Sequence, residues 1–164
     1  MDRKPFRILA VVGSLRQGSY NRGLLRAAEA LAPDWVEVRF FDIGQLPFFN
    51  EDVEAAGDPE PVHRFKEAIA TSNAVLIATP EYNGVVPGVL ANAIDWASRP
   101  TGRSVLRNKP VALMGAVLGK SGSANAQVHL ARCARSYRCH RGTRPTGAGA
   151  TRFQTLRRAG GPAR

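Results

Sequence analysis

The chain has 164 residues, 44% of them hydrophobic, which is enough for the core of one domain. No apolar run approaches the roughly 20 residues of a membrane span. The N-terminal residues 1–5 lead directly into a predicted strand, so we expect neither a membrane segment nor a signal peptide. The two cysteines, Cys133 and Cys139, are too few for a disulfide framework. We therefore expect a cytoplasmic protein.

The net charge of +10 is unevenly distributed along the chain. Residues 1–130 carry 14 Lys and Arg against 13 Asp and Glu, whereas residues 131–164 carry nine arginines and no acidic residue. A basic cluster on a folded face can bind nucleic acid, but this excess belongs to one segment of unusual composition. The charge pattern therefore disfavours a nucleic-acid partner for the body of the protein.

Apolar strands and amphipathic helices alternate from the N-terminus onward. Strands are predicted at 7–12, 35–41, 74–79 and 111–114, and the alternating pattern of the second places it at a sheet edge. Helices are predicted to begin near residues 19, 59, 87 and 124, and residues 42–60 form a long polar loop whose apolar residues 46–49 pack on the sheet. This order predicts an α/β fold with a doubly wound parallel sheet between two layers of helices.

The junction after the first strand is the most informative polar segment. The strand ends at Gly13, and Ser14, Arg16, Ser19 and Asn21 follow before or at the start of the helix. Hydroxyl, amide and guanidinium donors beside the N–H groups of a helix N-terminus suit a phosphate dianion. The missing lysine argues against a nucleotide-triphosphate loop, and the dinucleotide fingerprint is absent because the glycine spacing does not match it. The predicted ligand group is a single terminal phosphate monoester.

A second polar loop, residues 80–84, follows the third strand. Ligands of open α/β sheets bind outside the carboxyl ends of neighbouring strands, where the strand order reverses. The two loops are therefore predicted to face one crevice. Taken alone, residues 80–84 fit a plain turn equally well, because Pro, Asn and Gly all favour turns. Their pairing with the first loop favours a binding site.

These segments resemble the NAD(P)H-dependent FMN reductases, flavodoxin-like proteins that include quinone, chromate and azo-dye reductases. The resemblance covers about residues 7–130 and rests on three motifs in the same order: Gly13-Ser14-Leu15-Arg16 with Ser19-Tyr20-Asn21, then Pro80-Glu81-Tyr82-Asn83, then Pro87-Gly88 with Asn92-Ala93-Ile94-Asp95-Trp96-Ala97-Ser98-Arg99. It implies a flavodoxin-like fold, FMN as cofactor, NADPH or NADH as electron donor, a small-molecule acceptor (a quinone, azo or nitro compound, or chromate) and a homodimer or homotetramer.

The resemblance also assigns residues to the cofactor. Arg16 would neutralise the FMN phosphate with the neighbouring Ser and Asn side chains donating around it, and Tyr82 would stack on the flavin ring. Gly115 permits close backbone approach, and Val117 stands where many family members carry a serine that touches the flavin. The flavin carries the chemistry, so no catalytic side chain is predicted. The predicted cofactor-binding set is Ser14, Arg16, Ser19, Tyr20, Asn21, Pro80, Glu81, Tyr82, Asn83, Gly84, Gly115 and Val117.

Two other functions stay open. One is a flavodoxin-like FMN electron carrier that serves a protein partner, although such carriers are usually strongly acidic and residues 1–130 are nearly neutral. The other is a basic nucleic-acid-binding protein acting through residues 131–164, whose binding would depend steeply on salt. Cys133, Cys139 and His140 superficially resemble metal ligands, but no second pair stands at structural-zinc spacing, so no metal site is predicted.

Residues 131–164 depart from the pattern of the rest of the chain. Arginine recurs every three residues from Arg132 to Arg144, and the large apolar side chains are limited to Tyr137, Phe153 and Leu156. Such a segment cannot bury enough surface to offset its ordering entropy, although a flavodoxin-like domain requires a fifth strand and a last helix here. We predict a domain of residues 1–130 and a tail that is disordered or arises from a change of reading frame near residue 131. Any ordered part of it is expected to be irregular and exposed.

Overall fold

The computed structural model describes residues 4–118 and 122–136. Its four parallel strands are β1 (Phe6–Val12), β2 (Val36–Phe41), β3 (Ala74–Ala78) and β4 (Val111–Met114), in the order β2-β1-β3-β4. The helices are α1 (Tyr20–Ala30), the 3-10 turn η1 (Ile43–Gln45), α2 (Glu51–Ala56), α3 (Glu60–Thr71), α4 (Gly88–Ser98) and α5 (Ala124–Ser136). The predicted doubly wound parallel sheet is confirmed, with β2 at an edge as its alternating pattern indicated.

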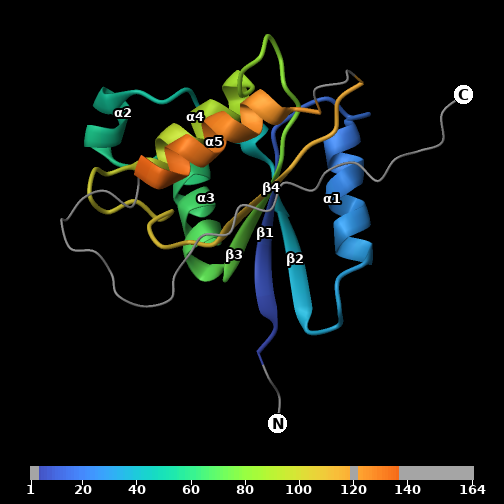
Figure 1. The fold of residues 1–164 in the computed structure, drawn as a ribbon. Coiled ribbons are helices and arrows are strands. Elements are labelled where there is room, and N and C mark those ends of the chain that lie inside the picture. Colours follow the sequence, from blue (N-terminus) through green and yellow to red (C-terminus); the bar gives the residue numbers. More distant parts are fainter. Residues whose placement is uncertain (1–3, 119–121, 137–164) are drawn as a thin grey trace, which may run out of the picture.

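The alternation of side chains along β1 divides the core into two layers. Leu9 and Val11 point to the face covered by α3, α4 and α5, where they join the larger apolar cluster. Ala10 and Val12 point to the opposite face and pack with Leu25 of α1. Figure 1 shows α1 alone on its side of the sheet and the other long helices together on the far side. One helix therefore covers this face of the sheet, whereas α3, α4 and α5 together cover the other face.

The segment 42–60 is more structured than the predicted polar loop, because it contains η1 and α2. Asn50 caps α2 by accepting a hydrogen bond from the Asp52 N–H at 2.8 Å, and acidic residues fill its first turn. Of residues 46–49, which were predicted to pack on the sheet, Leu46 is buried and Phe49 packs on helix α4, where its ring meets Trp96 edge-on at 5.0 Å. Phe48 differs, since 87% of its surface is exposed.

Helix α4 fixes the start of this segment through two polar side chains. The Trp96 indole N–H and the Asn92 amide both donate to the Pro47 carbonyl, at 2.8 and 2.9 Å, and Asn92 Oδ1 accepts from the Phe49 N–H at 2.7 Å. Trp96 is fully buried. The indole therefore satisfies its polar atom while its rings fill the core.

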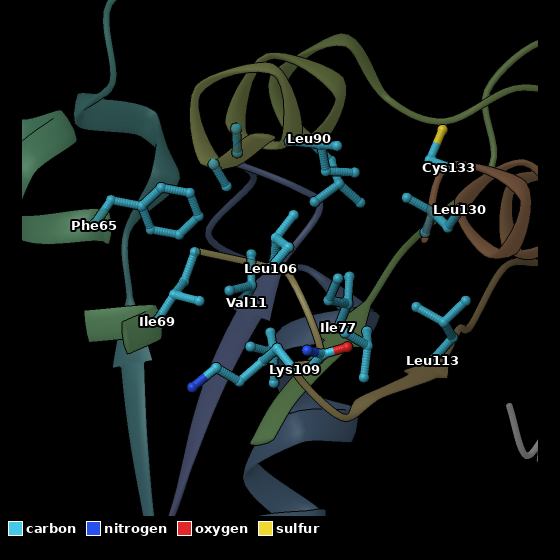
Figure 2. A pocket seen from close by; sticks show the side chains of 16 residues that line it. Val11, Phe65, Ile69, Ile77, Leu90, Leu106, Lys109, Leu113, Leu130 and Cys133 are labelled. Atoms are coloured by element: carbon cyan, nitrogen blue, oxygen red, sulfur yellow. The ribbon is translucent and has the colours of Figure 1, made fainter. Parts of the chain in front are cut away.

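The outer edge of β4 has no neighbouring strand among the described residues. An apolar cavity of about 50 Å³ lies beside it, between the sheet and helices α3, α4 and α5. In Figure 2 the side chains of Ile77, Leu106, Leu113 and Leu130 surround this space. Lys109 at its margin donates to the carbonyls of Ala70 and Ser72 at the end of α3. The cavity is thus lined mainly by apolar side chains, with Asn108 and Lys109 among its polar lining residues.

Helix α5 runs to Ser136, six residues past the predicted end of the domain at Leu130. The expected irregular chain is therefore not found at residues 131–136. Leu130 is buried and anchors the helix on the sheet, and the following Ala and Arg residues are good helix formers. The rest of the predicted tail, with Cys139 and His140, lies outside the described residues. Among the described helices none is long and apolar enough to cross a membrane.

Candidate functional site

A cleft of about 340 Å³ opens at the carboxyl ends of the strands, where the order reverses between β1 and β3. Three loops contribute to it: the β1–α1 loop, the loop after β3 and the loop after β4. Such a switch point is the usual ligand site of an open α/β sheet, and the volume falls within the range of small-molecule sites. Its lining residues are Ser14, Arg16, Ser19, Tyr20, Asn21, Pro80, Glu81, Tyr82, Ala116, Val117 and Leu118.

The β1–α1 loop brings anion-binding groups to one end of the cleft. Ser14 and Ser19 are buried, and Ser19 caps α1 by accepting a hydrogen bond from the Arg22 N–H at 3.4 Å. No acidic residue occupies the first turn of α1, so the positive end of its dipole is unopposed. The exposed Arg16 donates to the Gly18 carbonyl at 2.5 Å, and its guanidinium lies 5.4 Å from the centre of the Tyr20 ring. Hydroxyls, a guanidinium and a helix N-terminus therefore converge here.

Asn21 has a structural task besides lining the cleft. Its Oδ1 accepts from the Ala116 N–H and its Nδ2 donates to the Ala116 carbonyl, both at 2.9 Å. The side chain is buried. This reciprocal pair fixes the loop after β4 against the start of α1, so the amide predicted to donate to a phosphate is engaged mainly in holding two walls of the cleft together.

The loop after β3 forms a tight turn. Tyr82 and Val85 exchange backbone hydrogen bonds of 3.3 and 3.0 Å, and Asn83 and Gly84 between them have φ values of 53° and 76°. Asn-Gly is the pair that suits two consecutive positive φ angles. Tyr82, which is 54% exposed, lines the cleft from this turn. Asn83 and Gly84 themselves do not line the cleft.

Glu81 in the same loop contacts the N-terminus of α5. Its two carboxylate oxygens accept hydrogen bonds from the Asn125 side chain at 3.0 Å and from the Ala126 N–H at 3.1 Å. The Ala126 N–H is the largest of the causes that lower the pKa of this carboxyl below its usual value. Glu81 therefore stays ionised at neutral pH.

Gly115 is required by packing at the end of β4. A Cβ added there would overlap Ser123 Oγ and lie 2.5 Å from the Thr79 carbonyl oxygen. The close approach that Gly115 was predicted to allow is thus the approach of Ser123 and Thr79, and Gly115 is not among the lining residues. The loop presents Ala116, Val117 and Leu118 instead. Ala116 and Leu118 were not predicted, because an apolar side chain after a strand carries no distinctive signal.

The cleft offers little acid–base chemistry of its own. Glu81 is the single carboxylate among its lining residues, and no histidine lines it in the described part of the chain. Nor do the residues of 4–118 and 122–136 include a group of three or more His, Cys, Asp or Glu that could hold a metal ion. The arrangement is suited to holding an anionic group at one end and a flat ring beside Tyr82 at the other.

Comparison with known proteins agrees with this geometry. Residues 6–150 match the family described as NADPH-dependent FMN reductase. The chain belongs to this family. It is 48% identical over 124 residues to the NAD(P)H-dependent FMN reductase PA1204 of Pseudomonas aeruginosa, covering 76% of this chain and 66% of the relative. It is likewise 48% identical to a 2-hydroxy-1,4-benzoquinone reductase of Burkholderia sp, covering 76% and 67% of the two chains.

Among solved structures, the chain resembles FerB, a flavoenzyme NAD(P)H:(acceptor) oxidoreductase from Paracoccus denitrificans. The two share 41% identity and a TM-score of 0.75, over 80% of this chain and 71% of that one. This likeness supports the flavodoxin-like α/β fold. The chain spans about two thirds of the length of the curated relatives it matches.

Proposed function

We propose that this chain binds FMN in the cleft and uses NADPH or NADH to reduce a small-molecule acceptor of the quinone class. The observation that carries the proposal is the convergence of the Ser14–Asn21 loop and the Tyr82 turn on one cleft at the switch point. FMN has a phosphate monoester at one end and a flat ring at the other. The Ser14–Asn21 loop has donors that suit the phosphate, and Tyr82 has an aromatic ring that suits the flat ring of FMN.

The residues present fit the cofactor. Arg16, Ser14, Ser19 and the first turn of α1 would hold the phosphate by charge-assisted hydrogen bonds. Tyr82 and the backbone at 116–118 would flank the ring. Bound there, FMN would supply the hydride acceptance and electron donation that no side chain of the cleft offers. The protein would bind and orient the reactants.

The cleft mouth supports an aromatic donor and acceptor. Tyr82 is 54% exposed and Leu118 is 86% exposed, so apolar surface borders the opening. A nicotinamide or a quinone is flat and largely apolar, and each would gain from burial against such a surface. Azo and nitro compounds share this shape. Chromate is a further candidate acceptor, because the reductases that the sequence resembles include chromate reductases.

Arg16→Ala tests the site. We expect FMN affinity to fall by about 1.5–3 kcal/mol, the range for hydrogen bonds to charged groups, while riboflavin affinity stays unchanged, since riboflavin lacks the phosphate. Flavin fluorescence titration measures both. Arg26→Ala, in the second turn of α1 and outside the cleft lining, is the matched control. Equal losses for the two flavins would reject Arg16 as the phosphate residue.

Quinone-dependent NAD(P)H oxidation by the purified protein separates an enzyme from an electron carrier.

We further propose that the protein forms a homodimer or homotetramer and works in the cytoplasm. Exposed Leu118 and Tyr82 at the cleft mouth support a second copy at this face, which would cover apolar surface beside the bound ring. Reliance on NAD(P)H, a reductant kept inside cells, supports the cytoplasmic address. Analytical ultracentrifugation and cell fractionation test the two points.

A further inference from the structure

Glu81 both lines the cleft and contacts the start of helix α5. From the loop after β3 it lines the cleft, and its carboxylate accepts hydrogen bonds from the Asn125 side chain and the Ala126 N–H at the start of α5. These partners lie 44 and 45 residues further along the chain. One carboxylate therefore joins the loop after β3 to the end of the loop after β4.

Helix α5 has no negative charge of its own at this end. Its first turn contains no acidic residue. Ser123, just before the helix, accepts from the Gln127 side-chain amide at 3.0 Å with its hydroxyl. The first N–H groups of a helix need acceptors, and an anion near them is favoured by the helix dipole. Glu81 supplies both the acceptor and the charge from another part of the chain.

The third wall of the cleft is held at its two ends. At one end Asn21 fixes Ala116 to the start of α1. At the other, Ser123 packs against Gly115, and Glu81 holds the helix that follows. The lining residues 116–118 lie between these points. Release of either attachment would free this wall relative to the Tyr82 turn.

We propose that Glu81 is a positioning residue of the flavin site, whose carboxylate sets the spacing between the Tyr82 turn and the wall formed by residues 116–118. The inference rests on the proposed function. Glu81 acts on the ring half of the cleft, whereas Arg16 acts on the phosphate half. Loss of Glu81 therefore weakens FMN and riboflavin alike, which distinguishes its effect from that of Arg16.

The effect of pH on Glu81 has a definite sign. The pKa of its carboxyl is lowered from an ordinary value of 4.5, chiefly by the Ala126 N–H. The charge of His129 in α5 is a smaller cause that lowers the pKa of Glu81 in the same direction. A group with a lowered pKa contributes fully above its ordinary value and loses its contribution as the pH falls through the lowered one. The attachment is thus intact at neutral pH and fails in acid.

The test uses Glu81→Ala, Glu81→Gln and the control Glu37→Gln. Glu37 also binds two partners through a carboxylate of lowered pKa, but on β2, outside the cleft lining. Hydrogen exchange, followed by NMR on the flavin-free protein, should show lost protection of the Ala126 N–H in Glu81→Ala. The Gln127 N–H, bonded to the Ser123 carbonyl, should keep more of its protection. Unchanged exchange at Ala126 would overturn the proposal.

Flavin titrations complete the test. Glu81→Ala should weaken FMN and riboflavin equally, by about tenfold, and Glu81→Gln should recover part of this, since its amide oxygen can still accept from Ala126. At pH values below about 4.5, the riboflavin affinity of the wild type should decrease, whereas that of Glu81→Gln should not change. Unchanged flavin affinities in Glu81→Ala would overturn the positioning role. If the wild type binds no flavin, the proposed function fails, and the exchange data still decide the attachment.

Discussion

The two edges of the sheet differ in composition. At the β2 edge, Glu37 pairs with Arg7 at 3.3 Å and with Arg39 at 2.7 Å, so charged side chains cover the strand. The β4 edge consists of Val111, Ala112, Leu113 and Met114, without a charge, and the apolar cavity lies beside it. Natural proteins protect permanent edges with charge. β2 has the features of a permanent edge, and β4 has those of an interior strand.

This difference indicates that the β4 edge, unlike the β2 edge, is suited to pairing with a further strand. A right-handed crossover through α5 would return the chain to a strand parallel to β4, at the edge that has no neighbouring strand among the described residues. The relatives that this chain matches extend well beyond the matched region, since the chain covers about two thirds of their length. We therefore expect the β4 edge to limit both the stability and the solubility of the domain.

The largest effect is expected in the core next to the β4 edge. Leu113→Ala should lower the free energy of unfolding by about 2–5 kcal/mol, because Leu113 is buried against Ile77 and Leu130 in the larger cluster. Val38→Ala on β2, where the side chain is half-buried, should lower it by at most about 1.5 kcal/mol. Urea unfolding measures both. A smaller loss for Leu113→Ala than for Val38→Ala would contradict the view of β4 as an interior strand.

The next effect concerns self-association at the β4 edge, which no other strand of the described residues pairs with. Ala112 is exposed on β4, and Ala112→Lys should reduce self-association at high protein concentration because charge blocks strand pairing. Its free energy of unfolding should change by no more than about 0.5 kcal/mol. Light scattering and urea unfolding give the two values. The same change at Gln17, an exposed position off the sheet, is the control; equal reductions would mean that added charge alone matters.

The smallest effect is expected from pH at the β2 edge. The Arg39 side chain, more than any other group, holds the pKa of Glu37 below its ordinary value. Its stabilising contribution is therefore complete above about pH 4.5 and decreases as the pH falls through the lowered pKa. Glu37→Gln should remove this part of the acid dependence of the unfolding midpoint. Identical acid profiles for the two proteins would show that the ion pairs at this edge contribute nothing.

Much of the fold could be predicted because it depends on local patterns. Apolar runs marked β1, β3 and β4, and the alternation of β2 placed it at an edge. The short helix α2 was missed, although Asn50 followed by Glu51 and Asp52 is an N-cap with an acidic first turn, a signal that could have found it. The length of α5 was missed because the arginine-rich composition hid a helix that Leu130 anchors.

The site could be predicted only where polar residue types marked it. Arg16, the two serines and Tyr82 were found in the cleft because hydroxyl, guanidinium and aromatic groups after strands point to a ligand. The contacts that hold the cleft together could not be found, since each joins residues far apart in the sequence. Glu81 was predicted as a member of the cofactor-binding set, but its hydrogen bond to the Ala126 N–H has no local signature in the sequence.

The two hydrogen bonds between Asn21 and Ala116 have a consequence for how the protein folds during its synthesis. The two residues are 95 positions apart. At the usual rates of synthesis, about 5–20 residues per second, the β1–α1 loop is therefore made roughly 5–20 s before the residue that fixes it. Through that interval the start of α1 exists without one wall of its cleft. We therefore expect a ligand of this cleft to bind only after β4 has been translated.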